Sequence, residues 1–318
     1  MKIVVLDGFA ANPGDLSWDF LKEFTPDVTV YDRTPKEKIL QRAEGADIVI
    51  LNKTPLTKTE LSALTDLKLI AVLATGYNVV DCAYAREKGI AVANVPAYST
   101  NAVAQLTLSF ILEFASRVGE HTLSVKQGGW ASNPDFSYHA APTVELEGKT
   151  VGIIGFGSIG RRVAALCSAF GMNVVVNTAH PEKYADYPFE FTDLSVLLSR
   201  SDFVTVHCPQ TEKTTKMVNA DFLSKMKRTA FLVNTSRGGE VDEYALADAL
   251  NSGVIAGAGV DVLSAEPPAA DNPLIGAKNI FITPHIAWAA YETRARLLDI
   301  LYKNIRSFLD GTPVNIVN

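Results

Sequence analysis

Polar residues that could carry chemistry stand at the ends of apolar, strand-like runs in the second half of this chain. The run in "AFLVNTSRGG" leads to Arg237, and the run in "FITPHIAW" leads to His285. A third run, in "GAGVDVLSAEPP", leads to Asp261 and then to Glu266. A histidine ring changes its protonation near neutral pH, although its ordinary role at such a place is in the core or at a cap. An unpaired buried charge costs several kcal/mol, by order of magnitude, so these residues need one another or a ligand.

Two series of short β-branched runs alternate with helical patterns and would position these residues. The first series is "KIVVLD", "VTVYD", "DIVIL", "LKLIAVLAT" and "IAVANV". The second is "KTVGIIGFG", "MNVVVN", "DFVTVHC", "TAFLVNT", "IAGAGVDV" and "NIFITP". Such alternation builds parallel sheets covered by helices. Because the carboxyl ends of the strands form the ligand crevice of a doubly wound sheet, we expect Arg237, Glu266 and His285 to converge there.

Three longer segments surround and connect these series. Residues 99–128 have apolar residues spaced three and four apart, which predicts a helix. Residues 129–148, "GWASNPDFSYHAAPTVELEG", are rich in Pro, Ser, Asn and aromatic residues and are interpreted as an ordered excursion. The stretch "ETRARLLDILYKNIRSFLDG" predicts a final helix that closes on Gly311. The pattern leaves open whether this helix returns to the first domain.

A glycine motif predicts where a nucleotide binds. "VGIIGFGSIGRR" has Gly155, Gly157 and Gly160 in GxGxxG spacing, after the strand "TVGII" and at the start of a helical pattern. In that context Gly155 permits a tight turn, and Gly157 lets the backbone approach a pyrophosphate. Gly160 lets the helix pack against the strand while its N-terminal amides face the phosphates.

The choice between NAD and NADP is open from these residues. An NAD site usually has Asp or Glu about twenty residues after the glycines, at the end of the second strand. Here that strand ends in Asn177, Thr178, Ala179 and His180, with no acid among them to repel a 2′-phosphate. No arginine is present either, although His180 and Lys183 are near.

Composition and charge exclude several other classes. The chain has 318 residues, of which 47% are hydrophobic and 20% charged, so it can bury a large core. The net charge is −6 without a basic run, which argues against nucleic acid or an anionic membrane as partner. The apolar start is too short for a signal peptide, and no run reaches the length of a membrane span. Cys82, Cys167 and Cys208 lie too far apart to indicate a metal site or a disulfide framework. We expect a soluble cytoplasmic protein.

Taken together, the motifs resemble the D-isomer-specific 2-hydroxyacid dehydrogenase family over essentially the whole chain. The stretches "VGIIGFGSIGRRVA", "HCPQTEKTTKMVN", "FLVNTSRGGEVDEYALADAL", "GAGVDVLSAEPP" and "NIFITPHIAWAAYETR" follow the family's signatures in order and spacing. "LDGFAANPGDLSW" and "NPDFSY" are similar to its glycerate dehydrogenase (hydroxypyruvate reductase) branch. The resemblance implies hydride transfer between NAD or NADP and a small 2-hydroxy or 2-oxo acid, such as glycerate/hydroxypyruvate or glyoxylate.

The same resemblance implies roles for individual residues. Arg237 would bind the substrate carboxylate and C2 oxygen through its forked guanidinium. His285 would take the hydroxyl proton as hydride leaves for the nicotinamide, and return it in the reverse reaction. Glu266 would hydrogen-bond the other imidazole nitrogen and favour the imidazolium. Thr75 and Gly76 would present backbone amides to the substrate carboxylate.

Further residues are implied at the nucleotide, and two positions depart from the family. The implied nucleotide contacts are Thr107, Gly155, Phe156, Gly157, Ser158, Ile159, Gly160, Thr178, Cys208, Pro209, Thr214, Thr235, Ser236, Asp261 and Ala287. The family usually has an acidic residue at the place of Thr178, and this branch often has tryptophan at the place of His139. The first departure bears on cofactor preference and the second on the substrate.

The implied fold has two doubly wound parallel-sheet α/β domains, with a Rossmann nucleotide-binding domain inserted in a flavodoxin-like substrate domain. The substrate domain would comprise residues 1–98 and 288–318, and the Rossmann domain residues 99–287. A homodimer is expected, because the helix and excursion from residue 100 to 148 offer an apolar and aromatic surface. Two alternatives share this fold: formate dehydrogenase, expected to have Gln at the place of Glu266, and a nucleotide-sensing corepressor that acts by interaction.

Overall fold

The computed structural model describes residues 1–318, and the chain divides into two compact units. One unit consists of Met1–Ser99 and Ala289–Asn318, and the other of Thr100–Trp288. The boundaries expected from the sequence differ from these by one residue. None of the helices combines the length and the apolar composition needed to cross a bilayer.

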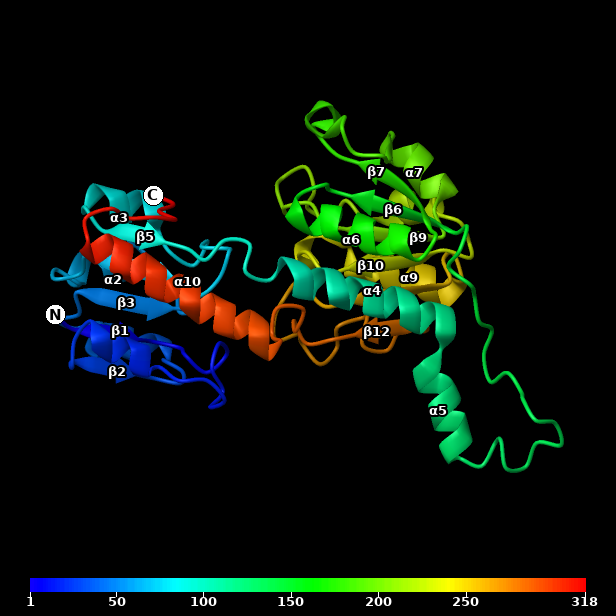
Figure 1. Ribbon diagram of the computed structural model, residues 1–318, viewed down its shortest axis with the longest axis horizontal. Coiled ribbons are helices and arrows are strands. Elements are labelled where there is room, and N and C mark those ends of the chain that lie inside the picture. Colours follow the sequence, from blue (N-terminus) through cyan, green and yellow to red (C-terminus); the bar gives the residue numbers. More distant parts are fainter. The chain divides into compact units, whose positions relative to one another are not determined.

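The discontinuous unit contains a parallel five-stranded sheet in the order β2-β1-β3-β4-β5 (Figure 1). This is the flavodoxin-like strand order. Three strands, β1, β3 and β4, are buried along their whole length, as expected for Val/Ile/Leu runs covered on both faces. The strands are β1 (Ile3–Val5), β2 (Val28–Val30), β3 (Ile48–Leu51), β4 (Leu69–Val72) and β5 (Ala91–Ala93).

Side-chain caps start two of the helices of this unit. Asp81 accepts a hydrogen bond from the backbone N–H of Tyr84, and Thr57 and Glu60 form a reciprocal capping box. The helices are α1 (Ile39–Ala43), α2 (Lys58–Ala63), α3 (Cys82–Glu87) and α10 (Tyr291–Leu309), with 3₁₀ turns η1 (Asp19–Glu23) and η2 (Lys36–Lys38). Helix α10 packs against β4, and its buried Asn304 donates to the carbonyl oxygen of Asn94 at 2.7 Å. The final helix therefore belongs to the first unit.

The second unit contains a parallel seven-stranded sheet in the order β12-β11-β10-β9-β6-β7-β8 (Figure 1). The order reverses between β6 and β9, which is the switch point at which doubly wound sheets bind ligands. Both sheets confirm the predicted fold class. The strands are β6 (Thr150–Ile154), β7 (Asn173–Asn177), β8 (Glu190–Phe191), β9 (Phe203–Val206), β10 (Phe231–Asn234), β11 (Gly257–Val260) and β12 (Ile280–Ile282).

Helices cover both faces of this second sheet. Alternate residues of its strands point to opposite faces and belong to two separate hydrophobic cores. Ile154, Val206 and Leu232 belong to one core, and their neighbours Ile153 and Val233 belong to the other. The helices are α4 (Thr100–Ser116), α5 (Val118–Lys126), α6 (Ser158–Ala169), α7 (Leu194–Arg200), α8 (Ala220–Ser224) and α9 (Glu243–Ser252), with 3₁₀ turns η3 (Pro181–Tyr184) and η4 (Gly238–Glu240).

The segment predicted as one helix over residues 99–128 is two helices in the structure. Arg117 adopts a left-handed conformation with φ 51° and separates α4 from α5. From this break, α5 and the excursion that follows extend away from the sheet of their unit (Figure 1). The excursion returns where the N–H of Val144 donates to the carbonyl oxygen of Ala115 at 2.8 Å. Residues 117–144 therefore form a closed arm, and we use that name below.

Candidate active site

His285 stands on a tight turn after β12 and is bonded to Glu266. Its φ of 53° lies in the left-handed region that few residues other than glycine adopt. Its backbone N–H donates to the carbonyl oxygens of Asp261 and Thr283, at 2.8 and 2.9 Å. Nδ1 of the ring lies 2.6 Å from Oε2 of Glu266, and the two side chains are 30% and 33% exposed. Because Nδ1 is engaged, the ring presents Nε2, which has no partner within the protein.

Asp261 builds the turn that holds His285. Its side chain is 1% exposed and accepts three hydrogen bonds, from the hydroxyl of Thr283 at 2.6 Å and from the N–H groups of Ile286 and Ala287 at 2.8 and 2.9 Å. A buried carboxylate with this many donors fixes the backbone around it. The implied nucleotide contacts of Asp261 and Ala287 stay predictions.

Arg237 follows β10 at the start of η4 and is exposed. Its Nη1 donates to the carbonyl oxygen of Ser236 at 2.7 Å, and its other guanidinium N–H groups have no acceptor in the protein. Its own carbonyl oxygen accepts a hydrogen bond from Nδ2 of the buried Asn234 at 2.8 Å. The backbone of Arg237 is therefore fixed while most of its guanidinium remains available to a ligand.

The turns that carry the three residues touch one another. A Cβ at Gly238 would lie 1.9 Å from the carbonyl carbon of Leu263, so only glycine lets η4 approach the loop after β11 so closely. The N–H of Leu263 in turn donates to Oε1 of Glu266 at 3.1 Å. This chain of contacts leads from Arg237 through Glu266 to His285, at the carboxyl edge of one sheet.

The glycine motif forms the turn between β6 and α6. Gly155 has φ 93°, and a Cβ there would lie 2.6 Å from the backbone of both His207 and Cys208. A Cβ at Gly160 would lie 2.1 Å from the carbonyl oxygen of Gly155. Both glycines are therefore required by packing, which brings β6, β9 and α6 close together.

The start of α6 fits an anionic ligand. No side chain caps the helix at Gly157, and a Cβ at Gly157 would meet no atom within 4 Å. The N–H groups of a helix's first turn lack intrahelical partners and favour negative charge. Nearby, after β9, both ring nitrogens of His207 are shielded from solvent without a hydrogen-bond partner, and burial lowers its pKa to about 3. An open cradle and an orphaned polar ring at the switch point fit a nucleotide.

Phe156, Ser158 and Ile159, which stand between the glycines of the motif, differ in their environments. The Phe156 side chain is 1% exposed and packs edge-on against aromatic rings that include Tyr184 and Phe191, so only its backbone can face a nucleotide. Ser158 is exposed at the first position of α6, and Ile159 follows it. Their contacts with a nucleotide stay predictions.

The remaining implied nucleotide residues follow β7, β9 and β10 or lie on α4. Thr178 comes directly after β7 and is half-buried. The hydroxyls of Thr107 and Thr235 are buried and lie 2.9 Å apart. The loop after β9 is tied by a hydrogen bond of 2.8 Å from the hydroxyl of Thr214 to the carbonyl oxygen of Pro209. These elements all end at the carboxyl edge of the seven-stranded sheet or border it.

Thr75 and Gly76 belong to the other unit, in the loop after β4. Thr75 is exposed; its hydroxyl donates to the carbonyl oxygen of Val95 at 2.9 Å. Its carbonyl oxygen accepts a hydrogen bond from Nδ2 of Asn94 at 2.8 Å. The loop is thus ordered within its own unit, and the substrate contact of its amides stays a prediction.

Comparisons with known proteins identify the family. Residues 108–287 match the sequence model of the D-isomer-specific 2-hydroxyacid dehydrogenase, NAD-binding domain. The chain is 46% identical to hydroxypyruvate reductase from Blautia hydrogenotrophica, over 100% of both chains. The chain belongs to the D-isomer-specific 2-hydroxyacid dehydrogenase family. It is therefore an NAD(P)-dependent oxidoreductase that acts on the CH–OH group of its donor, as the resemblance predicted.

Two further relatives support the glycerate branch of this family. Glycerate dehydrogenase from Methylorubrum extorquens is 39% identical, with 99% of this chain and 98% of the relative covered. The structure of an NADPH-dependent glyoxylate/hydroxypyruvate reductase from Sinorhizobium meliloti, in complex with NADP and malonate, matches with a TM-score of 0.83. That match has 28% identity and covers 99% of this chain and 96% of the other.

Two buried polar residues near Arg237 in this dehydrogenase were missed from the sequence. Asn234 and Glu240 are both 0% exposed and both bond the backbone of Arg237. Glu240 stands three positions after Arg237, a spacing that resembles a capping box and could have signalled it. In a stretch as polar as "RGGEVDE", however, an acid predicts a solvated turn.

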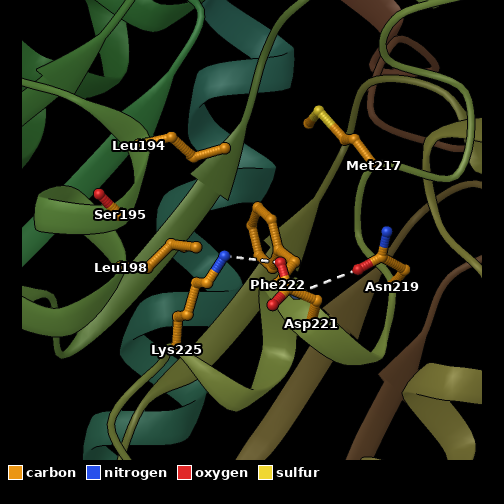
Figure 2. A pocket seen from close by; sticks show the side chains of 8 residues that line it. All are labelled: Leu194, Ser195, Leu198, Met217, Asn219, Asp221, Phe222 and Lys225. Atoms are coloured by element: carbon orange, nitrogen blue, oxygen red, sulfur yellow. Dashed lines mark hydrogen bonds and ion pairs between the residues drawn. The ribbon is translucent and has the colours of Figure 1, made fainter.

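A surface pocket of the dehydrogenase lies apart from this site. Figure 2 shows it between α7 and α8 together with the segment that leads into α8. Asp221 and Lys225 form an ion pair of 2.6 Å beside it. The lining residues are Leu194, Ser195, Leu198, Met217, Asn219, Asp221, Phe222 and Lys225. None of them is a predicted site residue, and most are apolar or engaged in capping α8. This pocket does not contribute to the assignment.

Proposed function

We propose that this dehydrogenase interconverts a small 2-oxo acid, hydroxypyruvate or glyoxylate, and the corresponding D-2-hydroxy acid. The observation that carries the proposal is the bond of 2.6 Å between Nδ1 of His285 and Glu266, which leaves Nε2 open after β12, in the same sheet as the glycine-motif turn. When bound, NAD or NADP supplies or accepts the hydride. The names of relatives that act on hydroxypyruvate, glycerate and glyoxylate support the substrate class.

His285 would move the proton that accompanies the hydride. In reduction, the C2 oxygen takes a proton from Nε2, and in oxidation Nε2 takes it back. Glu266 would act through the ring as a positioning residue, because its carboxylate fixes the orientation of the imidazole and stabilises the imidazolium. The turn built by Asp261 limits the freedom of the ring, which favours one proton-transfer geometry.

Arg237 would bind the acid itself. A guanidinium presents a planar fork of donors that matches a carboxylate and can also polarise the adjacent carbonyl oxygen. The N–H groups left without acceptors in the structure supply these donors. Backbone amides of Thr75 and Gly76 would add neutral donors to the same carboxylate.

The cofactor would be held by its pyrophosphate at the start of α6 and by its adenosine ribose near Thr178. The open space at Gly157 supports the first placement. A neutral threonine neither repels a 2′-phosphate nor binds it as a cation would. We propose that the enzyme uses both NADH and NADPH without strict discrimination.

The functional form would be a cytoplasmic homodimer. Three free cysteines support a reducing compartment. The arm supports the dimer, because its large apolar side chains are exposed: Val118, Leu123, Val125, Trp130, Phe136 and Val144. Several exposed large apolar side chains on one segment favour an interface there.

Turnover of a small set of acids tests the proposal. Glyoxylate, pyruvate and hydroxypyruvate are each supplied with NADH and with NADPH, and the loss of reduced nicotinamide is followed. We expect hydroxypyruvate or glyoxylate to have the highest kcat/KM of the three acids. Formate with NAD⁺ tests the related formate chemistry, which Glu266 disfavours. Binding of NADH without turnover of any acid would contradict the proposal and support an interaction protein.

A further inference from the structure

Glu240, three residues after Arg237, is a buried carboxylate that has no role in the mechanism proposed above. It is 0% exposed and lies at the end of η4. Its Oε2 accepts a hydrogen bond from the backbone N–H of Arg237 at 3.3 Å, and its Oε1 accepts one from Sγ of Cys208 at 3.4 Å. The side chain thus joins the turn after β10 to the loop after β9.

The bond to Arg237 completes the fixation of that residue's backbone. Asn234 holds the carbonyl oxygen of Arg237, and Glu240 holds its N–H group. With both backbone groups held, the Cα–Cβ direction of Arg237 is set, and the guanidinium is aimed from a rigid base. Loss of either bond would let the turn rotate, which would misdirect the guanidinium without removing it.

The bond to Cys208 extends the same network to the loop that borders the nucleotide site. The hydroxyl of Ser236 donates to the carbonyl oxygen of Cys208 at 2.7 Å, parallel to the bond between the Cys208 thiol and Glu240. Two bonds therefore tie the Arg237 turn to this loop. A shift of the loop would be transmitted to Arg237 through Glu240.

We propose that Glu240 is a positioning residue that fixes the Arg237 turn to the Cys208 loop and thereby sets the affinity for the substrate carboxylate. This inference rests on the proposed function of Arg237 and adds a residue that acts through it. Glu240 touches neither substrate nor cofactor in this account. Its effect is therefore expected in KM more than in kcat.

The charge of Glu240 changes near neutral pH, because burial raises its pKa to about 7. Interactions with Cys208, Arg237 and Ser236 lower the pKa of Glu240 and offset only part of the increase that burial causes. Burial and the neighbouring Glu240 raise the pKa of Cys208 to about 12, so that thiol stays a donor. His207 is neutral, and the flanking Lys216 and Asp242 pair with each other at 3.7 Å. Of these charged residues, Arg237 is the one bonded to the Glu240 carboxyl, through its backbone N–H group.

The sign of the pH effect follows from these contacts. Above about pH 7 the carboxylate accepts strongly from the N–H of Arg237, and below it the neutral acid accepts more weakly. The KM for hydroxypyruvate should therefore rise as the pH falls through this value. Proton transfer in the reaction itself also makes the assay depend on pH, so the informative quantity is the difference in KM between the parent and a variant without the Glu240 carboxyl.

Glu240→Gln and Glu240→Leu supply that comparison. Gln keeps the shape and an acceptor oxygen without charge, and Leu fills the space without an acceptor. Both should raise the KM for hydroxypyruvate about fivefold at alkaline pH, with kcat within about twofold, and remove the acid-side rise in KM. Glu212→Gln, an exposed acid on the loop after β9, removes the same charge and should behave as the parent.

A second readout needs no turnover. The amide of Arg237 should exchange its hydrogen about fivefold faster in Glu240→Leu than in the parent, measured by NMR on the folded protein. If no 2-oxo acid is reduced, the proposed function fails while the exchange rate still tests Glu240. Parental KM, parental pH profile and parental exchange in variants with parental melting temperatures would overturn the inference. If Glu240→Leu does not fold, Glu240→Gln decides by the same measurements.

Discussion

The two carboxylates beside the site differ in environment, and that difference separates their roles. Glu266 is one-third exposed and bonds a ring that can carry a positive charge. Glu240 is fully buried and accepts hydrogen bonds from the backbone N–H of Arg237 and the thiol of Cys208. A partly solvated carboxylate is suited to stabilise an imidazolium, whereas a desolvated one resists ionisation. Burial of Glu240 should therefore make the stability of the fold depend on pH.

The buried carboxyl should make stability fall as the pH rises. Burial raises the pKa of Glu240 to about 7, above the ordinary value of about 4.3. Between these values the folded state keeps a proton that the unfolded chain has lost, so the contribution is full below about pH 4 and declines toward pH 7. Relative to the parent, Glu240→Leu should gain up to about 3 kcal/mol between pH 5 and 8.

Urea unfolding of both proteins at about pH 5 and pH 8 measures this gain. Glu212→Gln serves as the control, and its difference from the parent should not change with pH. A difference between Glu240→Leu and the parent that is the same at both pH values would show that Glu240 is ionised without cost.

We expect cofactor choice to be decided at a single residue as well. Thr178→Asp should restore preference for NADH, because the carboxylate accepts a hydrogen bond from the ribose 2′-hydroxyl and repels a 2′-phosphate. We expect kcat/KM with NADPH to fall by about tenfold or more relative to NADH. Thr178→Asn, which adds an acceptor without charge, is the control. A parent that already rejects NADPH by several orders of magnitude would place the discrimination elsewhere.

At the scale of elements, the β6–α6 turn was predictable because the glycine spacing stands between an apolar strand and a helical pattern. The break between α4 and α5 at Arg117 was not predictable, since the nearby Gly119 lies inside α5 and the apolar spacing continues through the break. The two-residue strand β8 is likewise too short to leave a pattern. Arg237, Glu266 and His285 were found from strand ends, whereas the burial of Glu240 depends on how the loop after β9 packs over it.

Two glycines of the β6–α6 turn should respond differently to the same substitution. Gly155→Ala meets the backbone of His207 and Cys208 and has φ 93°, so it should destabilise the fold by about 1–3 kcal/mol. Gly157→Ala meets open space and should leave the melting temperature near that of the parent. It should nevertheless weaken NADH binding, because its methyl group occupies the space assigned to the pyrophosphate.

Differential scanning fluorimetry and NADH fluorescence titration measure the two effects separately. Parental NADH affinity in Gly157→Ala would contradict the placement of the pyrophosphate at the start of α6. Parental stability in Gly155→Ala would contradict the close approach of β6 and β9.

At the scale of the molecule, two parallel sheets were predictable. Apolar runs predict strands, and the helical patterns between them predict parallel crossover connections. The apolar periodicity of the last helix does not show which of the two sheets it packs against, since an apolar helix face can pack against either. The structure assigns α10 by specific contacts, such as the bond from Asn304 to Asn94. The family resemblance, by contrast, implies this connection.

The arm predicts the oligomeric state. Phe136 is 90% exposed, an unfavourable state for a large apolar side chain in a monomer. Light scattering at micromolar concentration should give twice the chain mass of 34.3 kDa, and Phe136→Asp should shift the protein toward the monomer. Asp135→Asn, beside it in the exposed arm, is the control. A monomeric parent would remove the dimer from the account.

The most direct test of the central claim is the rate of reduction by His285→Ala. If Nε2 of His285 delivers the proton, kcat for hydroxypyruvate should fall by roughly two to four decades while NADH affinity and melting temperature stay near those of the parent. His121→Ala, which removes a ring on α5 bonded to the carbonyl oxygen of Arg117, should keep parental kcat. Near-parental kcat in His285→Ala, with NADH bound, would contradict the account.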